Sequence, residues 1–219
     1  MSGKLIVIEG LDGSGKSTQL ELLRQNLGER PARYIKFPNY ESDSSALVRM
    51  YLGGQFGTHP QDVNAYAAAS FYAVDRYAGF KSDWGRDWLS GTVILCDRYV
   101  TSNAIHQAGK LPHDEWGEYV DWLYDFEFDK LGLPRPDAVI YLDMPIEISQ
   151  RLMSGRYNGD EGKKDIHERD IEYLHNCRRA ALFAAERMGW NVIACADGSE
   201  PRSREDIAAD VLRATLAVL

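Results

Sequence analysis

The 219-residue chain lacks the features that mark membrane, fibrous and disordered proteins. No apolar run approaches the roughly 18–20 residues that span a bilayer, so we expect neither a transmembrane helix nor a membrane partner. Repeats, linkers and low-complexity tails are absent, and strand-like sequence begins within the first few residues, which argues against a signal peptide. We therefore expect one globular domain over residues 1–219.

Cysteine and net positive charge are also scarce. The three cysteines, Cys96, Cys177 and Cys195, are widely spaced, which favours free buried thiols and a cytoplasmic location. The formal net charge of -8 argues against a nucleic-acid partner, because such proteins carry a basic surface. The same negative field repels phosphate-bearing ligands at long range, so any phosphate site needs locally concentrated positive charge.

The most informative stretch is Gly10-Leu-Asp-Gly-Ser-Gly-Lys-Ser17, which fits the phosphate-loop pattern G-x-x-x-x-G-K-[ST]. It lies between the strand-like run Leu5–Ile8 and the helical pattern Thr18–Arg24, where the N–H groups of a helix start attract an anion. Lys16 can act on the outer phosphates as a catalytic residue, and Ser17 can ligate Mg²⁺. The residues predicted to bind ATP are Gly10, Leu11, Asp12, Gly13, Ser14, Gly15, Lys16, Ser17 and Thr18.

Strand-like and helical patterns alternate along the chain. The predicted strands cover residues 5–8, 33–37, 91–96, 138–142 and 191–195. This alternation predicts an α/β fold, a five-stranded parallel sheet flanked by helices. Ligands of such sheets bind beyond the carboxyl ends of the strands, so the phosphate loop and Asp97–Arg98 should share one crevice.

Three helix predictions are specific enough to test. One helix covers residues 60–88 and is bent or broken near Gly79. A second covers residues 165–188, and a third starts with Ser44 or Ser45 as its cap.

Three charged residues are candidates for the crevice. Asp97 ends an apolar strand, where a carboxylate can help to hold Mg²⁺ or cap a turn. Arg98 presents a planar fork suited to phosphate, although it could also pair with the carboxylate beside it. Asp12 is awkward among N–H groups meant for an anion, so it should point outward, to bind a sugar hydroxyl, to orient a basic group, or only to meet solvent.

Two further patterns have both a functional and an ordinary interpretation. Tyr72 and Arg76 are four residues apart on one helical face, a pair that could stack on a base and bind its carbonyl, or form core and surface. Residues 151–165 are too polar to pack. They are either a solvated loop or a mobile lid that supplies an arginine to phosphoryl transfer.

Together these residues resemble the thymidylate kinases, the nucleoside-monophosphate kinases that phosphorylate dTMP. The resemblance covers nearly the whole chain, and only the phosphate loop is specific on its own. The motifs that carry it are Glu9–Gln19, Phe37–Pro38, Phe71–Arg76, Asp97–Asn103, Leu131–Asp137 and the lid of about residues 151–165. It implies a P-loop kinase fold, ATP and dTMP as substrates, Mg²⁺ as cofactor, and a homodimer.

The resemblance also implies a role for each matching residue. Asp12 would hold the 3′-hydroxyl of the deoxyribose, Arg98 would bind the dTMP phosphate, and Asp97 would share the metal with Ser17. Tyr72 would stack on thymine and Arg76 would bind its carbonyl. The other residues expected to line the dTMP site are Phe37, Pro38, Tyr40, Arg49, Asn103, His106 and Gln107.

Three positions depart from the family pattern. Gly13 stands where one branch has a basic residue, so the catalytic arginine should come from the lid, as Arg151 or Arg156. Tyr72 stands where phenylalanine is usual. His106 stands where tyrosine often lies near C2′ of the sugar and helps to reject ribonucleotides.

We therefore predict transfer of the ATP γ-phosphoryl group to dTMP, giving dTDP and ADP. The alternatives are a kinase for another nucleotide or nucleoside, and a P-loop ATPase or switch protein without a nucleotide acceptor. The guanine motif N-K-x-D of GTPase switches is absent from the sequence.

Overall fold

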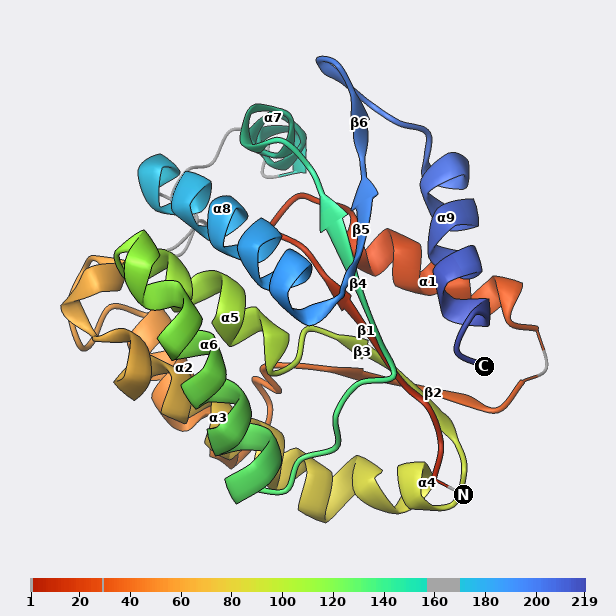
Figure 1. Cartoon of the computed structure of the whole chain (residues 1–219), viewed down its shortest axis with the longest axis horizontal. Helices are drawn as coiled ribbons and strands as arrows, with labels where there is room; N and C mark the ends of the chain where they lie inside the picture. The colour runs from red at the N-terminus through yellow and green to blue at the C-terminus, as the bar shows by residue number, and fades with distance from the viewer. Residues whose placement is uncertain (1, 29, 157–169) are drawn as a thin grey trace.

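The computed structural model describes residues 2–28, 30–156 and 170–219. Its centre is a five-stranded sheet in the order β2-β3-β1-β4-β5, and every neighbouring pair is parallel (Figure 1). The strands are β1 (Leu5–Glu9), β2 (Ala32–Lys36), β3 (Val93–Asp97), β4 (Ala138–Asp143) and β5 (Asn191–Ala194). The predicted α/β class is confirmed, and all five predicted strands are present.

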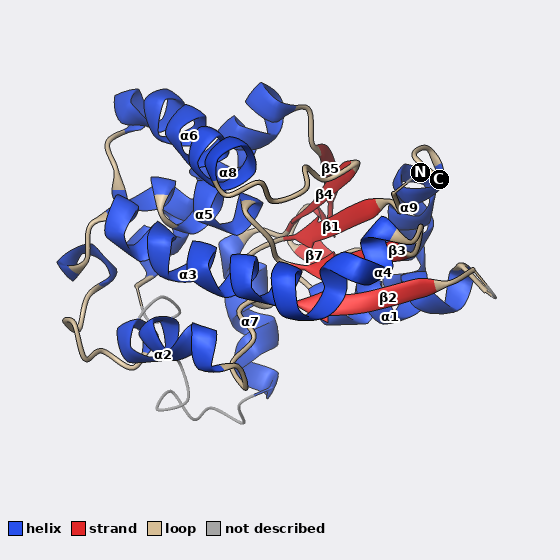
Figure 2. Ribbon diagram, turned by 90° about the horizontal axis from the view of Figure 1, so that it is seen from below, coloured by secondary structure: helices blue, strands red, loops and turns tan. Residues whose placement is uncertain are grey.

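Helices cover both faces of the sheet (Figure 2). They are α1 (Lys16–Asn26), α2 (Ala46–Leu52), α3 (Ala65–Gly79), α4 (Gly85–Leu89), α5 (Thr101–His106), α6 (Trp116–Tyr124), α7 (Ile146–Arg156), α8 (Ile171–Met188) and α9 (Arg204–Leu216). Ile6 and Ile8 of β1 belong to a core with α1 and α9, whereas Leu5 and Val7 belong to a core with α3, α5, α6 and α8. A central parallel strand is apolar throughout because both of its faces are covered in this way.

The helix predicted over residues 60–88 was wrong in its start. Pro60–Asp62 form a separate 3₁₀ turn, and α3 begins after Asn64, whose side chain caps it by accepting from the Ala67 N–H at 2.8 Å. The irregularity predicted near Gly79 is present: α3 ends at Gly79, and a π-helical turn over Phe80–Trp84 joins it to α4.

Ser45 occupies the predicted N-cap position of α2, but its hydroxyl does not accept from the helix and instead donates to the Ser42 carbonyl. The serine that accepts from the backbone is Ser42, which receives the Ser44 N–H at the start of a 3₁₀ turn preceding α2.

Two differences lie in the last third of the chain. α8 begins at Ile171 behind its cap Asp170, and residues 165–169 of the predicted helix lie outside the described residues. A short antiparallel hairpin of β6 (Ala196–Asp197) and β7 (Glu200–Pro201) follows β5 and was not predicted, because two-residue strands leave no alternating pattern.

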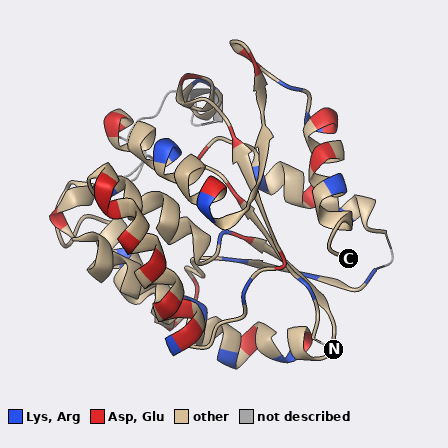
Figure 3. Cartoon of the chain, viewed as in Figure 1, with Lys and Arg blue, Asp and Glu red and all other residues tan. Residues whose placement is uncertain are grey.

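Two surface properties complete the description. Acidic residues recur along the outer helices α6 and α9 (Figure 3), in keeping with the net charge of -8. Among the helices that the structure describes, none combines the length and the hydropathy required to cross a bilayer.

Candidate functional site

The loop between β1 and α1 is shaped by glycines in the left-handed region. Gly13 has φ 79° and Gly15 has φ 91°, a region that costs other residues about 1–2 kcal/mol. Gly15 is the residue before α1, so the helix starts at Lys16 and its first N–H groups lack helical acceptors. Ser17 is exposed and Thr18 half-buried in that first turn, where phosphate-binding loops hold their ligand.

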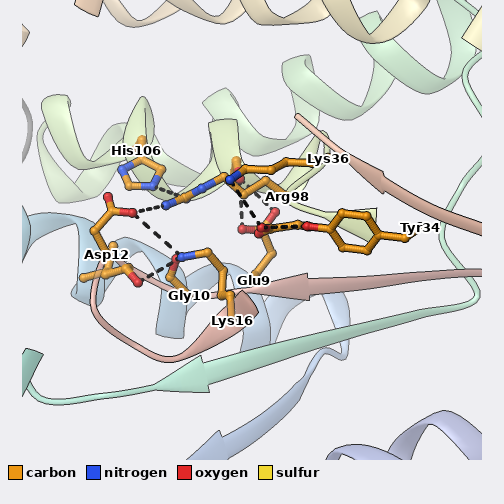
Figure 4. Close-up of polar contacts among 11 residues, drawn as sticks. Glu9, Gly10, Asp12, Lys16, Tyr34, Lys36, Arg98 and His106 are labelled. Carbon is orange, nitrogen blue, oxygen red and sulfur yellow. Dashed lines mark hydrogen bonds and ion pairs between the residues drawn. The ribbon is translucent and has the colours of Figure 1, made fainter. Parts of the chain in front are cut away.

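Lys16 is folded back over the loop. Its Nζ donates to the carbonyl of Gly10 at 2.8 Å and to that of Leu11 at 3.0 Å, and its side chain is only 8% exposed (Figure 4). Burial and the positive charge of Arg98 lower the pKa of Lys16 to about 8, although Asp12 opposes this shift. The loop therefore contains a buried cation held by carbonyls, the kind of group that favours an anionic ligand.

Arg98 connects the end of β3 to the phosphate loop. Its Nη2 donates to Asp12 Oδ1 at 2.6 Å and its Nη1 to His106 Nε2 at 2.9 Å (Figure 4). Its φ of 69° is the left-handed conformation that non-glycine residues rarely adopt, which often marks a functional position. This contact confirms that the loop and Asp97–Arg98 lie together at one edge of the sheet.

The charged groups in this cluster shift one another's pKa values. Burial alone would raise the pKa of Asp12, but the charges of Arg98 and Lys16 outweigh it and hold that pKa well below its usual value. Burial would lower the pKa of Arg98, and Asp12 together with Glu9 raises it instead. Asp12 is therefore ionised and Arg98 charged throughout the physiological range.

Glu9 is a buried carboxylate that the sequence-based prediction did not assign to the site. It accepts from the Tyr99 N–H at 3.1 Å, from Thr101 Oγ1 at 2.7 Å and from Ser102 Oγ at 2.9 Å. Burial raises its pKa, against the opposing effect of Arg98 and these hydrogen bonds. The one signal in the sequence was an acidic residue directly after the apolar run Leu5–Ile8.

Asp97 lies at the carboxyl end of β3, beside Ile8 of β1. It is 1% exposed, accepts from the Tyr34 hydroxyl at 3.3 Å, and has the Lys36 Nζ at 3.8 Å. Its Oδ1 is buried without a hydrogen-bond partner among the residues that the structure describes. Within those residues no three His, Cys, Asp or Glu side chains are grouped so as to hold a metal ion.

A buried ion pair occupies the α3 side of the site. Arg76 donates from Nε to Glu127 Oε2 at 2.7 Å, from Nη2 to Glu127 Oε1 at 2.5 Å, and from Nη1 to the Tyr99 carbonyl at 3.3 Å. Asn103 Nδ2 donates to the same Glu127 Oε1 at 3.1 Å and to the Ala69 carbonyl at 3.2 Å. Glu127 is fully buried, on a π-helical turn after α6, and it holds Arg76 and Asn103, two of the residues predicted to line the dTMP site.

Sequence reasoning missed Glu127 for a physical reason. Its neighbours Asp125 and Asp129 are charged too, so the segment has the pattern of a solvated surface. The π-helical turn changes the periodicity there and directs Glu127 inward.

The loop after β2 is held by α3. Asp75 accepts from the Asn39 N–H at 2.8 Å and from the Ser44 hydroxyl at 2.7 Å. Phe37, the residue before Pro38, is buried at 4% exposure. This anchoring places Phe37 and Pro38, which were predicted to line the dTMP site, at the carboxyl end of β2, beside β3.

The remaining predicted dTMP residues differ in their surroundings. The guanidinium of Arg49 donates to the carbonyls of Tyr40 and Ser42 at 2.8 Å each, and so braces its own loop. Tyr40 is 48% exposed and Tyr72 is half-buried. Gln107 is 1% exposed, and its Oε1 has no hydrogen-bond partner within the described parts of the chain.

Gly13 lies directly against α7. A Cβ added at Gly13 would come within 2.8 Å of the Ser149 carbonyl oxygen and 2.9 Å of Met153 Cγ. The loop therefore has no room for a side chain at this position, and the base of the expected lid packs on it.

Only one of the two predicted lid arginines has a side chain that the structure describes. Arg151 Nη2 donates to the Ser199 carbonyl at 3.1 Å and to Glu200 Oε2 at 3.2 Å, so it contacts the β6–β7 hairpin. Arg156 is the last residue of α7, and its side chain lies outside the described part of the structure, as do residues 157–165 of the predicted lid.

Comparisons with known proteins identify the family. The thymidylate kinase family profile matches residues 8–207. Thymidylate kinase of Mycobacterium tuberculosis (strain ATCC 25618 / H37Rv) is 34% identical over 191 residues, covering 85% of this chain and 87% of that protein. The probable thymidylate kinase of Pyrococcus horikoshii is 28% identical over 214 residues, covering 97% of this chain and 95% of its own.

A solved structure supports the fold. The thymidylate kinase of Candida albicans superimposes with a TM-score of 0.73 at 21% identity, covering 99% of this chain and 92% of the other. The resemblance drawn from the motifs is confirmed: the chain belongs to the thymidylate kinase family, the nucleoside-monophosphate kinases that phosphorylate dTMP.

Proposed function

We propose that one crevice at the carboxyl edge of the sheet holds ATP on the β1–α1 loop and dTMP beyond β2 and β3. The γ-phosphoryl group then passes directly from ATP to dTMP, giving dTDP and ADP without a covalent intermediate. The observation that carries this assignment is the contact of Arg98 with Asp12, because it joins the acceptor side to the phosphate loop. Residues 1–219 act as a single kinase domain.

The charges needed for transfer are supplied from three sides. Lys16 and the loop N–H groups bind the outer phosphates of ATP, and Arg98 binds the phosphate of dTMP. Asp12 orients Arg98 and accepts from the sugar 3′-hydroxyl. An arginine from the lid, Arg151 or Arg156, reaches the transferred group when the lid closes, since such arginines contribute about 10³–10⁵ in rate.

Ser17 and Asp97 fit a bound Mg²⁺. Ser17 is exposed at the start of α1, and Asp97 has a buried Oδ1 without a hydrogen-bond partner in the described residues. Mg²⁺ usually takes one or two protein oxygens and completes its shell with water and phosphate oxygens. When bound, it neutralises charge on the ATP phosphates.

The base site is selective through Arg76 and Asn103. The three bonds of Arg76 leave one N–H on each terminal nitrogen, so the group can only donate to a base. Both Asn103 N–H donors are used by Glu127 and Ala69, which leaves its amide oxygen as an acceptor. The Arg76 donor suits O4 of thymine, and the Asn103 acceptor suits N3–H. The same pair disfavours cytosine. Tyr72 stacks on the ring.

Two finer statements belong to the same proposal. Tyr66, Val74 and Tyr77 expose an apolar stripe on α3, which supports a homodimer. Val74→Glu should then yield a monomer, as measured by light scattering.

Three buried free thiols, Cys96, Cys177 and Cys195, support a cytoplasmic location.

An acceptor panel tests the function. With ATP and Mg²⁺ present, we expect dTMP to be phosphorylated faster than dUMP, dCMP, dGMP and thymidine. Preference for another acceptor would identify a kinase of different specificity. ATP turnover that ignores all acceptors would instead favour an ATPase.

A further inference from the structure

The contact between Arg98 and His106 determines the protonation state of the histidine. Arg98 Nη1 lies 2.9 Å from His106 Nε2. A guanidinium has only N–H donors, so Nε2 must be the acceptor. Since imidazolium has no acceptor nitrogen, His106 in this contact is neutral and carries its proton on Nδ1.

The surroundings keep His106 in place. The residue ends α5 and is 8% exposed, and its backbone carbonyl accepts from the Tyr173 hydroxyl of α8 at 2.8 Å. Arg98 is thereby bound at two different nitrogens, by His106 at Nη1 and by Asp12 at Nη2. Two anchors define the plane of a guanidinium, whereas a single contact leaves it free to swing.

We propose that His106 is a positioning residue for Arg98, acting as a neutral acceptor that sets the plane of the guanidinium. The inference rests on the proposed role of Arg98 in binding the dTMP phosphate. It gives the histidine a role different from reading the sugar at C2′.

Groups from three elements surround this histidine. Arg98 from the end of β3 and Asp12 from the phosphate loop lie on its ring side, and Tyr173 and Cys177 of α8 contact its carbonyl. A proton on Nε2 would remove the acceptor and place a second positive charge beside Arg98. The contact therefore requires the neutral ring.

Nitrogen NMR tests the contact independently of activity. Spectra of ¹⁵N-histidine-labelled protein at pH 7.5 should show a pyridine-type Nε2 and a protonated Nδ1 for the resonance that disappears in His106→Gln. A protonated Nε2 at this pH would overturn the inference.

Kinetics test the positioning role. Glutamine can accept at this position and leucine cannot, so KM for dTMP should be about tenfold higher in His106→Leu than in His106→Gln, with a smaller change in kcat. The exposed His113→Gln is the matched control and should keep the KM of the unmodified enzyme.

The outcomes separate this inference from the proposed function. Equal KM values in the glutamine and leucine variants overturn the role of His106. If Arg98→Ala loses dTMP binding in the same assays, the proposed function stands without it. An unimpaired Arg98→Ala enzyme overturns both.

Discussion

Arg98 Nη2 and Asp12 Oδ1 lie 2.6 Å apart although 86 residues separate them in the chain. The pair joins the end of β3 to the loop after β1, and both partners are partly shielded from water. A charged pair in such a place orients the groups around it more strongly than a surface pair does. Substitution of Arg98 should therefore change the measured kinetics of the enzyme.

Arg98→Ala should lower kcat/KM for dTMP by about two orders of magnitude or more, because it removes the cation for the acceptor phosphate. Steady-state kinetics with varied dTMP measure this. The control is Arg187→Ala, which removes an arginine of α8 from its exposed pair with Asp121 of α6. That control should keep full activity, and near-normal dTMP kinetics in Arg98→Ala would show that the phosphate role is wrong.

Gly13→Ala should destabilise the protein by about 1–3 kcal/mol more than Gly132→Ala, as expected for overpacking a filled site. Both glycines have similar positive φ values, 79° and 70°, so backbone strain is matched. Only Gly13 has atoms of α7 within 3 Å of an added Cβ, whereas Gly132 has nothing within 4 Å. Urea unfolding measures both variants, and equal losses would contradict the tight packing of α7 on the loop.

The pKa of Lys16, about 8, predicts opposite responses of activity and stability to alkali. Lysine attracts phosphate only when protonated, so kcat/KM for ATP should fall as the pH rises above 8. The unfolded chain keeps the lysine proton up to its ordinary pKa of 10.5. Between pH 8 and 10.5 the unfolded chain therefore binds more protons than the folded protein. This residue's contribution to the free energy of unfolding rises with pH over that range. Initial rates and thermal unfolding from pH 7 to 9.5 check both signs, and an ATP profile that stays flat to pH 9.5 would refute the expectation.

Glu127→Gln should cost about 3–5 kcal/mol of unfolding free energy, because it leaves the guanidinium of Arg76 buried without its counter-charge. Variant enzyme that remains folded should have a raised KM for dTMP. Denaturant unfolding and kinetics measure the two effects.

Two companion variants make the Glu127 result decisive. Replacing both Arg76 and Glu127 by methionine should recover stability without recovering dTMP binding, since no charge is then left unpaired. Glu118→Gln, on the exposed side of α6, should change neither quantity. Recovery of dTMP binding in the double variant would remove Arg76 from the base site.

Local patterns predicted the frame of this protein. The apolar run of β1, the glycines of the loop and the carboxylate after β3 each leave a signature within a few residues, because strand burial and helix starts depend on neighbouring side chains. These signatures were sufficient to place Gly10–Ser17 and Asp97–Arg98 at one edge of a parallel sheet. The resemblance to thymidylate kinases added that Gly13 stands where one branch of the family has a basic residue.

The hydrogen-bond partners of the site residues could not be predicted from local sequence patterns. Sequence alone placed a phosphate loop and a strand-end Asp–Arg pair at one edge of the sheet, and it left Arg98 with several possible partners. The tertiary structure decided that Arg98 binds Asp12 and His106, that Glu127 holds Arg76 and Asn103, and that α7 excludes a side chain at Gly13. The physical reason is that these contacts join segments tens of residues apart, and only the packing of helices on both faces of the sheet brings them within hydrogen-bond distance.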